Sequence, residues 1–176
     1  MDKTIYLIRH CQATGQAPDA KLTEMGKQQA QKLAEFLQKR QVDHVISSPF
    51  TRAIQSIEPA ADLLDLPIEI DDRLAERVLS TEDLPDWMEK LEKSFGDADL
   101  TFAGGESGKE ATERAMEAMN EMKDRTAAVT HGNLLGLLLK QIDAGYGFSE
   151  WKKLTNPDVY EVQIRSGHLS IARIWS

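Results

Sequence analysis

A short apolar run near the N-terminus, residues 4–8, constrains the fold of this chain more than any other stretch. Its β-branched and aromatic residues stop abruptly at Arg9 and His10, and the polar, turn-prone residues 12–15 follow. An apolar run bounded by turn signals predicts a buried strand of a parallel sheet, and open α/β sheets bind ligands at the carboxyl ends of such strands. A guanidinium offers a fork of donors to phosphate oxygens, and a neutral imidazole is a competent nucleophile. The pair therefore predicts chemistry on a phosphoryl group.

Apolar runs of strand length alternate with amphipathic stretches of helical length through most of the chain. Further strands are expected over residues 44–49, 67–71 and 126–132, and helices over residues 23–40, 50–64, 107–123 and 133–142. Residues 159–165 and 169–175 lie on either side of a Gly-containing turn, which predicts a C-terminal hairpin. The alternation predicts an α/β fold, with a mainly parallel sheet and helices on both faces, in a single domain over residues 1–176.

Composition narrows the class of protein. Lys and Arg number 21 against 29 Asp and Glu, a formal charge of -8, which argues against a nucleic-acid or anionic-membrane surface. The single cysteine has no neighbouring Cys or His cluster of the kind that binds zinc. No signal-peptide pattern and no apolar run of membrane-spanning length is present. We therefore expect a cytoplasmic protein without a metal or other cofactor, and its oligomeric state stays open.

Ionisable residues follow four of the expected strands. Arg9 and His10 follow the first strand, the segment after Ser48 follows the second, Glu76 lies beyond the third, and His131 ends the fourth. Because the carboxyl ends of parallel strands lie along one edge of a sheet, these residues are expected to converge on one site.

Five motifs in order along the chain resemble those of the histidine phosphatase superfamily, in its phosphoglycerate mutase-like branch. They are Leu7-Ile8-Arg9-His10, Leu22-Thr23-Glu24-x-Gly26-x-x-Gln29-Ala30, Ser47-Ser48-Pro49-x-x-Arg52-Ala53, Gly105-Glu106-Ser107 and Thr130-His131-Gly132.

The resemblance implies a phosphohistidine mechanism on a small phosphorylated substrate. His10 would be the nucleophile, and Arg9, Arg52 and His131 would surround the phosphoryl oxygens. Glu76 stands where the family has its general acid and base. The two arginines and the second histidine would supply the positive charge that other phosphatases take from metals, so no metal is expected.

The sequence departs from the family pattern in three places. Cys11 stands where the family usually has glycine, and the phosphate-binding asparagine near residue 16 is missing, so Thr14 or Gln16 would donate in its place. Residues 78–82 replace the usual Gly-x-Trp-Glu-Gly, so other carboxylates stay candidates for the acid. Among them is Glu106, which would alternatively hold a backbone segment or an arginine in place.

Several functions remain open at this stage. The cysteine-dependent phosphatase signature needs an arginine at position 17, where this chain has Ala17, so Cys11 is interpreted as a packing residue. The long basic insertions of cofactor-dependent mutases are missing, which favours a phosphatase over a phosphoglycerate mutase-type transferase. A protein phosphohistidine phosphatase and a catalytically weak phospho-ligand binding protein also remain candidate functions.

Overall fold

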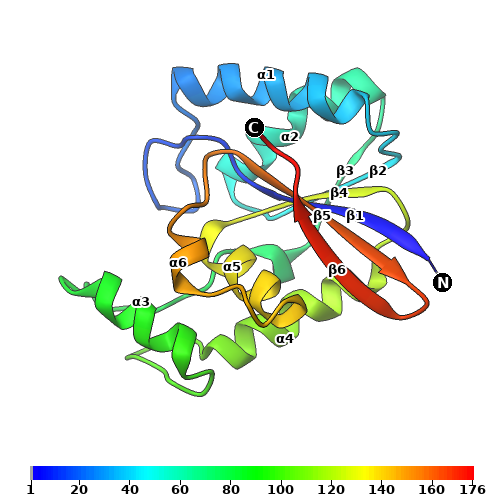
Figure 1. The fold of residues 1–176 in the computed structure, drawn as a ribbon. Coiled ribbons are helices and arrows are strands. Elements are labelled where there is room, and N and C mark those ends of the chain that lie inside the picture. Colours follow the sequence, from blue (N-terminus) through cyan, green and yellow to red (C-terminus); the bar gives the residue numbers. More distant parts are fainter. Residues whose placement is uncertain (1) are drawn as a thin grey trace.

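The computed structural model describes residues 2–176, and the strands of this part form one six-stranded sheet in the order β3-β2-β4-β1-β5-β6 (Figure 1). The strands are β1 (Lys3–Arg9), β2 (His44–Ser47), β3 (Ile68–Ile70), β4 (Thr126–Thr130), β5 (Asp158–Arg165) and β6 (His168–Arg173). The helices are α1 (Glu24–Gln38), α2 (Thr51–Leu64), α3 (Trp87–Gly96), α4 (Gly108–Glu121), α5 (Gly132–Ile142) and α6 (Phe148–Trp151), with a 3-10 turn, η1 (Asp72–Leu74).

The sheet is parallel over its first four strands and antiparallel over its last two. Strands β3, β2, β4 and β1 pair in parallel, whereas β5 runs antiparallel to β1 and continues into β6. The turn between β5 and β6 uses Ser166 and Gly167, both with positive φ. The predicted fold class, including the C-terminal hairpin, is confirmed.

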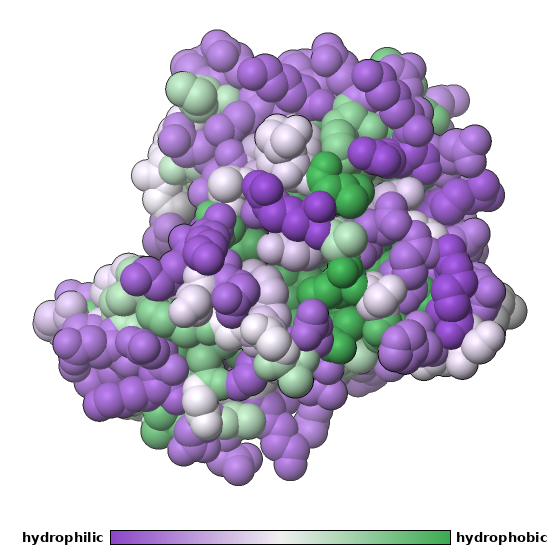
Figure 2. All heavy atoms as spheres, viewed as in Figure 1, coloured by the Kyte–Doolittle hydropathy of each residue, from purple (hydrophilic) through white to green (hydrophobic). Residues whose placement is uncertain are grey.

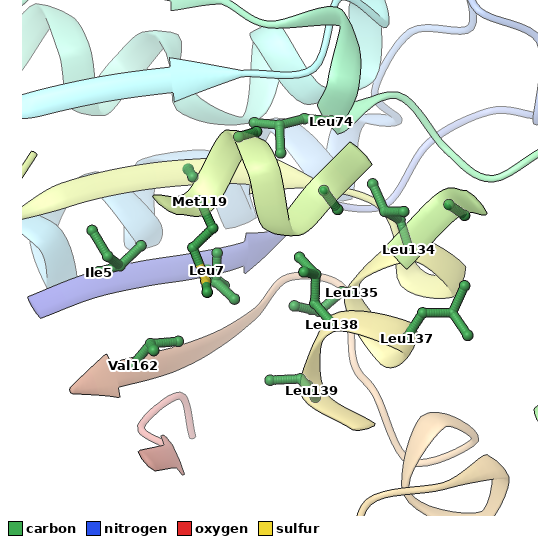
Figure 3. Close-up of a cluster of buried hydrophobic side chains, with 14 of the residues drawn as sticks. Ile5, Leu7, Leu74, Met119, Leu134, Leu135, Leu137, Leu138, Leu139 and Val162 are labelled. Atoms are coloured by element: carbon green, nitrogen blue, oxygen red, sulfur yellow. The ribbon is translucent and has the colours of Figure 1, made fainter. Parts of the chain in front are cut away.

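Side chains of β1 alternate between two cores, one on each face of the sheet. Tyr6 and Ile8 face α1 and α2, while Ile5 and Leu7 face the layer that contains α4 and α5 (Figure 3). This alternation follows from the two-residue period of a strand whose two faces are both covered. The outer surface over α1 is hydrophilic, as expected of an amphipathic helix (Figure 2).

Helix α5 starts directly after the fourth parallel strand and is almost wholly apolar. Its five leucines are all buried: Leu134, Leu135, Leu137, Leu138 and Leu139. Burying a leucine side chain contributes roughly 1.5–3 kcal/mol, so this helix is firmly fixed against the sheet. Its N-terminus is therefore a rigid point at the edge where β4 ends.

The segment between β3 and α4 follows the sequence pattern least closely. A partly helical stretch is expected over residues 78–95, but α3 starts only at Trp87. Pro85 explains the late start, because the residue before a proline is disfavoured in the helical region. Leu91 and Phe95 are buried, whereas Trp87 and Met88 are exposed. Among residues 2–176, no helix has the length and apolar character needed to span a membrane.

Candidate active site

Two histidines lie side by side where β1 and β4 end. These strands are parallel neighbours with Arg9 opposite Thr130, so the residues that follow, His10 and His131, leave the sheet at the same edge. The His10 backbone N–H donates to the Thr130 carbonyl at 3.1 Å, and the centroids of the two imidazoles are 5.1 Å apart. The parallel register thus places both rings in one site.

The hydrogen bonds of His10 indicate which of its two ring nitrogens carries the hydrogen. Its Nδ1 lies 2.7 Å from the Cys11 carbonyl, which can only accept, so Nδ1 carries the hydrogen. The Arg52 Nε–H then points at Nε2 from 3.3 Å. Burial, aided by the charges of Arg52 and Arg9, lowers the pKa of His10 to about 4. At neutral pH the ring is therefore uncharged, with Nε2 available as a nucleophile.

Arg52 is held in the first turn of α2 by main-chain oxygens. Its Nη1 donates to the carbonyls of Gln16 at 3.2 Å and Ala17 at 2.9 Å, and its guanidinium lies 5.0 Å from the centroid of the Phe50 ring. The side chain is 1% exposed, and burial lowers its pKa. In the described part of the chain, no carboxylate lies within ion-pair distance of Arg52.

Arg9 lies at the end of β1, against the start of α5. Its Nη1 donates to the Leu154 carbonyl at 3.1 Å, while its Nε is buried and has no hydrogen-bond partner among the described residues. A Cβ at Gly132 would come within 2.9–3.0 Å of the guanidinium, so only glycine fits there without a shift. Like Arg52, Arg9 has no ion-pair partner within residues 2–176, and burial lowers its pKa.

His131 is fully buried and oriented by a hydroxyl. The Ser48 Oγ accepts from the Phe50 N–H at 3.2 Å and lies 2.7 Å from His131 Nε2, the one acceptor described for its hydroxyl hydrogen, so we assign the hydroxyl as the donor to that nitrogen. This tautomer leaves an N–H at Nδ1, which has no partner among the described residues. Burial, followed by the charges of His10 and Arg52, lowers the pKa of His131 well below its ordinary value. The ring is thus a neutral donor.

Glu76 reaches the same edge from the segment that follows η1. Its carboxylate accepts three backbone N–H bonds, from Asn133 at 3.1 Å, Leu134 at 2.9 Å and Arg77 at 2.8 Å. The first two donors belong to the first turn of α5, where anions are stabilised. Burial raises the pKa of Glu76, and these N–H bonds and the Arg9 charge oppose that rise. The net effect is a carboxyl group that protonates more readily than usual.

The structure therefore brings together five of the residues singled out by the sequence, Arg9, His10, Arg52, Glu76 and His131. The side chains of Thr14 and Gln16 are exposed on the loop after β1. Gln16 contributes its carbonyl to Arg52, and the described hydrogen bonds include none from either side chain.

Sequence reasoning missed three polar residues that support the site. Ser48 orients His131, Ser56 accepts the Cys11 N–H at 2.8 Å, and the Asn156 side chain donates to the His10 carbonyl at 3.0 Å. Ser48 belongs to one of the five motifs and lies directly at a strand end, which was the available signal. Asn156 lies 146 positions from His10 in the chain, and no local pattern connects them.

Cys11 is buried in the core between the sheet and the α1 and α2 layer. Burial raises the pKa of its thiol to about 11, against a smaller opposing effect of the Ser56 hydroxyl. A thiol in this state is a poor nucleophile. Within residues 2–176, no group of three or more His, Cys, Asp or Glu side chains has a geometry that could hold a metal ion.

Comparisons with known proteins agree with this architecture. A family profile described as the histidine phosphatase superfamily (branch 1) matches residues 5–175. A protein of Shigella dysenteriae serotype 1 (strain Sd197), named probable phosphoglycerate mutase GpmB, is 28% identical over 192 residues, which cover 97% of this chain and 83% of that protein.

Two solved structures show the same fold at low sequence identity. A mycobacterial glucosyl-3-phosphoglycerate phosphatase has a TM-score of 0.78 at 21% identity, with 99% of each chain covered. A phosphoserine phosphatase mutant of Entamoeba histolytica, determined with phosphoserine, has a TM-score of 0.76 at 21% identity, with 97% of this chain and 96% of that chain covered.

Proposed function

Because this chain belongs to the histidine phosphatase superfamily, branch 1, we propose that it is a metal-independent hydrolase of small phosphomonoesters that works through a phosphohistidine at His10. One observation carries the proposal: the buried guanidinium of Arg52 and the partly buried guanidinium of Arg9 have no carboxylate within ion-pair distance in the described part of the chain, and both lie close to a neutral imidazole. Buried charges without a partner are costly. A bound phosphoryl group would neutralise both.

In the first step, the His10 Nε2 lone pair attacks phosphorus while the bond from phosphorus to the leaving oxygen breaks. Arg9, Arg52 and the His131 Nδ1–H stabilise the charge on the equatorial oxygens. Glu76 gives its proton to the leaving alkoxide, for which its raised pKa suits it. The products are the free alcohol, the Glu76 carboxylate and phosphohistidine.

In the second step, water replaces the alcohol. The Glu76 carboxylate takes a proton from the water, whose oxygen attacks phosphorus as the bond from phosphorus to Nε2 breaks. Inorganic phosphate leaves, and Glu76 is again protonated. The neutral state of His10 favours this step too, since its low pKa makes the imidazole a good leaving group.

The nucleophile is tested with p-nitrophenyl phosphate in EDTA. Wild-type protein should release p-nitrophenol, and His10→Ala should lower kcat by a factor of about 10⁴ or more because the covalent intermediate cannot form. His168→Ala, which removes an exposed imidazole of β6, is the matched control and should keep wild-type turnover. Wild-type protein quenched in alkaline denaturant during turnover should carry a phosphoryl group that is stable to base and is lost in acid, as a phosphohistidine is. Unchanged turnover of His10→Ala would refute the assignment.

The role of Glu76 as general acid is tested by comparing esters with poor and good leaving groups. Glu76→Gln should slow alkyl phosphates by about 10²–10⁴-fold and p-nitrophenyl phosphate far less, because only the poor leaving group needs a proton in the transition state. Equal losses on both esters would show that Glu76 has a structural role instead.

A mutase is the second candidate, favoured by the name of the 28% identical relative. The two activities differ in their products when 3-phosphoglycerate is supplied. A phosphatase releases inorganic phosphate and glycerate, whereas a mutase returns the phosphoryl group to another hydroxyl and releases almost none. Phosphoserine, a glucosyl-phosphoglycerate and a phosphohistidine protein complete the substrate panel, and binding without turnover of any of them would indicate a phospho-ligand binding protein.

A further inference from the structure

We propose that Glu106 and Arg114, which lie outside the phosphate-binding cluster, are positioning residues that fix the main chain of residues 73–78 and thereby aim the Glu76 carboxyl group. The inference rests on the proposed function, because it concerns the proton that Glu76 delivers. All three hydrogen bonds that the Glu76 carboxylate accepts come from backbone N–H groups, so its position depends on how this short segment is held.

Arg114, on α4, forms hydrogen bonds to the main chain of residues 73–78 on the N-terminal side of Glu76. Its Nη1 donates to the carbonyl of Arg73 at 2.6 Å and to that of Ala75 at 3.0 Å, directly before Glu76. Its Nε and Nη2 donate to the two carboxylate oxygens of Glu106 at 2.8 and 3.0 Å. One guanidinium thus joins the residues before Glu76 to Glu106, and its planar fork fixes the angle between them.

Glu106 forms hydrogen bonds to residues 77 and 78, on the C-terminal side of Glu76. Its Oε2 accepts the Val78 N–H at 2.9 Å, its own N–H donates to the Val78 carbonyl at 2.8 Å, and its carbonyl accepts from Arg77 at 3.2 Å. The close approach depends on Gly105, where a Cβ would lie 2.0 Å from the Leu79 carbonyl oxygen. Together the two side chains hold the main chain on both sides of Glu76.

The charge state of Glu106 suits this role and not that of a proton donor. Burial alone would raise its pKa, but Arg114 and the Val78 N–H hold the pKa below its ordinary value. Both of its oxygens are already engaged by hydrogen bonds. The pair is also less exposed than an ordinary surface ion pair, at 23% for Arg114 and 24% for Glu106.

A nearby ion pair provides a matched control. Glu117, also on α4, pairs with the Arg73 side chain at 3.3 Å, but its own side chain is 69% exposed. Glu117→Gln therefore removes one carboxylate charge, as Glu106→Gln does, without removing a bond to the main chain beside Glu76. It should change turnover of neither ester.

The test combines Glu106→Gln with the two kinds of ester. Glu106→Gln should slow an alkyl phosphate by about 10–100-fold, the scale of a misplaced catalytic group, and p-nitrophenyl phosphate by less than about threefold. Arg114→Lys, which keeps the charge and loses the fork, should show the same selectivity, and it repeats the test should Glu106→Gln unfold near the assay temperature.

A double mutant separates positioning from plain stabilisation. If Glu106 acts through Glu76, adding Glu106→Gln to Glu76→Gln should bring no further loss on the alkyl phosphate, whereas independent effects would multiply. Equal losses on both esters, or multiplying losses, would overturn the inference. Either result leaves the proposed function intact, since that function is tested separately, by the turnover of His10→Ala and by the release of inorganic phosphate from small phosphomonoesters.

Discussion

Acidification should destabilise this protein, and protonation of His10 should account for a measurable part of the loss. The burial of the His10 ring, with help from two nearby guanidiniums, lowers its pKa from 6.5 to about 4. The unfolded chain therefore binds a proton at a pH where the folded chain does not. The contribution of His10 to the free energy of unfolding is fully present above pH 6.5. It is lost as the pH falls towards 4, because the unfolded state binds the proton more tightly.

The magnitude follows from the size of the shift. One pKa unit corresponds to about 1.4 kcal/mol, so the whole shift corresponds to about 3 kcal/mol. Between pH 7 and pH 4.5, about 2 kcal/mol of this should be lost from the free energy of unfolding. For a protein whose total stability is of the order of 5–15 kcal/mol, such a loss is large.

The assay is urea unfolding followed by tryptophan fluorescence at pH 7 and at pH 4.5, in wild type and in His10→Asn. The asparagine amide can still donate to the Cys11 carbonyl but does not titrate. The variant should lose about 2 kcal/mol less than wild type between the two pH values, with an unchanged m-value. His168→Asn serves as the control for replacing an exposed imidazole. An equal pH dependence in wild type and His10→Asn would refute the assignment of a buried, neutral His10.

Three further predictions follow from close packing around the site. Gly132→Ala should lower kcat/KM by about tenfold or more, measured with p-nitrophenyl phosphate, because its Cβ would press on the Arg9 guanidinium. The Cys11 thiol should resist a thiol reagent at pH 7.5 in the native protein and react fully in urea, because burial raises its pKa to about 11. Gly26→Ala should cost about 1–3 kcal/mol in urea unfolding, because its Cβ would lie 2.1 Å from the Gln12 carbonyl oxygen.

The sequence predicted best what depends on local pattern. The apolar runs that end at His10 and at His131 form buried strands, as a run of consecutive apolar residues predicts. Their parallel direction follows from the helices that connect the strands. Once the strands are parallel, their exits share an edge, and the two imidazoles meet because β1 and β4 are also neighbours in the sheet, an order that the structure supplies. Arg52 follows for the same reason, because α2 begins just beyond β2.

The remaining features depend on contacts that no local pattern encodes. Glu76 lies on a short irregular stretch, and its place is set by the first turn of α5, more than fifty residues away. The late start of α3 results from Pro85 within a charged stretch whose periodicity is otherwise helical. The family resemblance points to the side chain of Thr14 or Gln16 as a phosphate donor. It gives no sign that the Gln16 carbonyl, which every residue type would provide, binds Arg52.

The contact between Arg52 and the main chain of residues 16 and 17 has a consequence for the loop after β1. Arg52 is tethered by two carbonyl oxygens of the loop after β1, at positions 16 and 17. Point substitutions at positions 16 and 17 keep both carbonyl oxygens, so the tether itself does not depend on which side chains stand there. Adding or deleting a residue would move both oxygens away from the guanidinium, so the placement of Arg52 depends on the length of this loop.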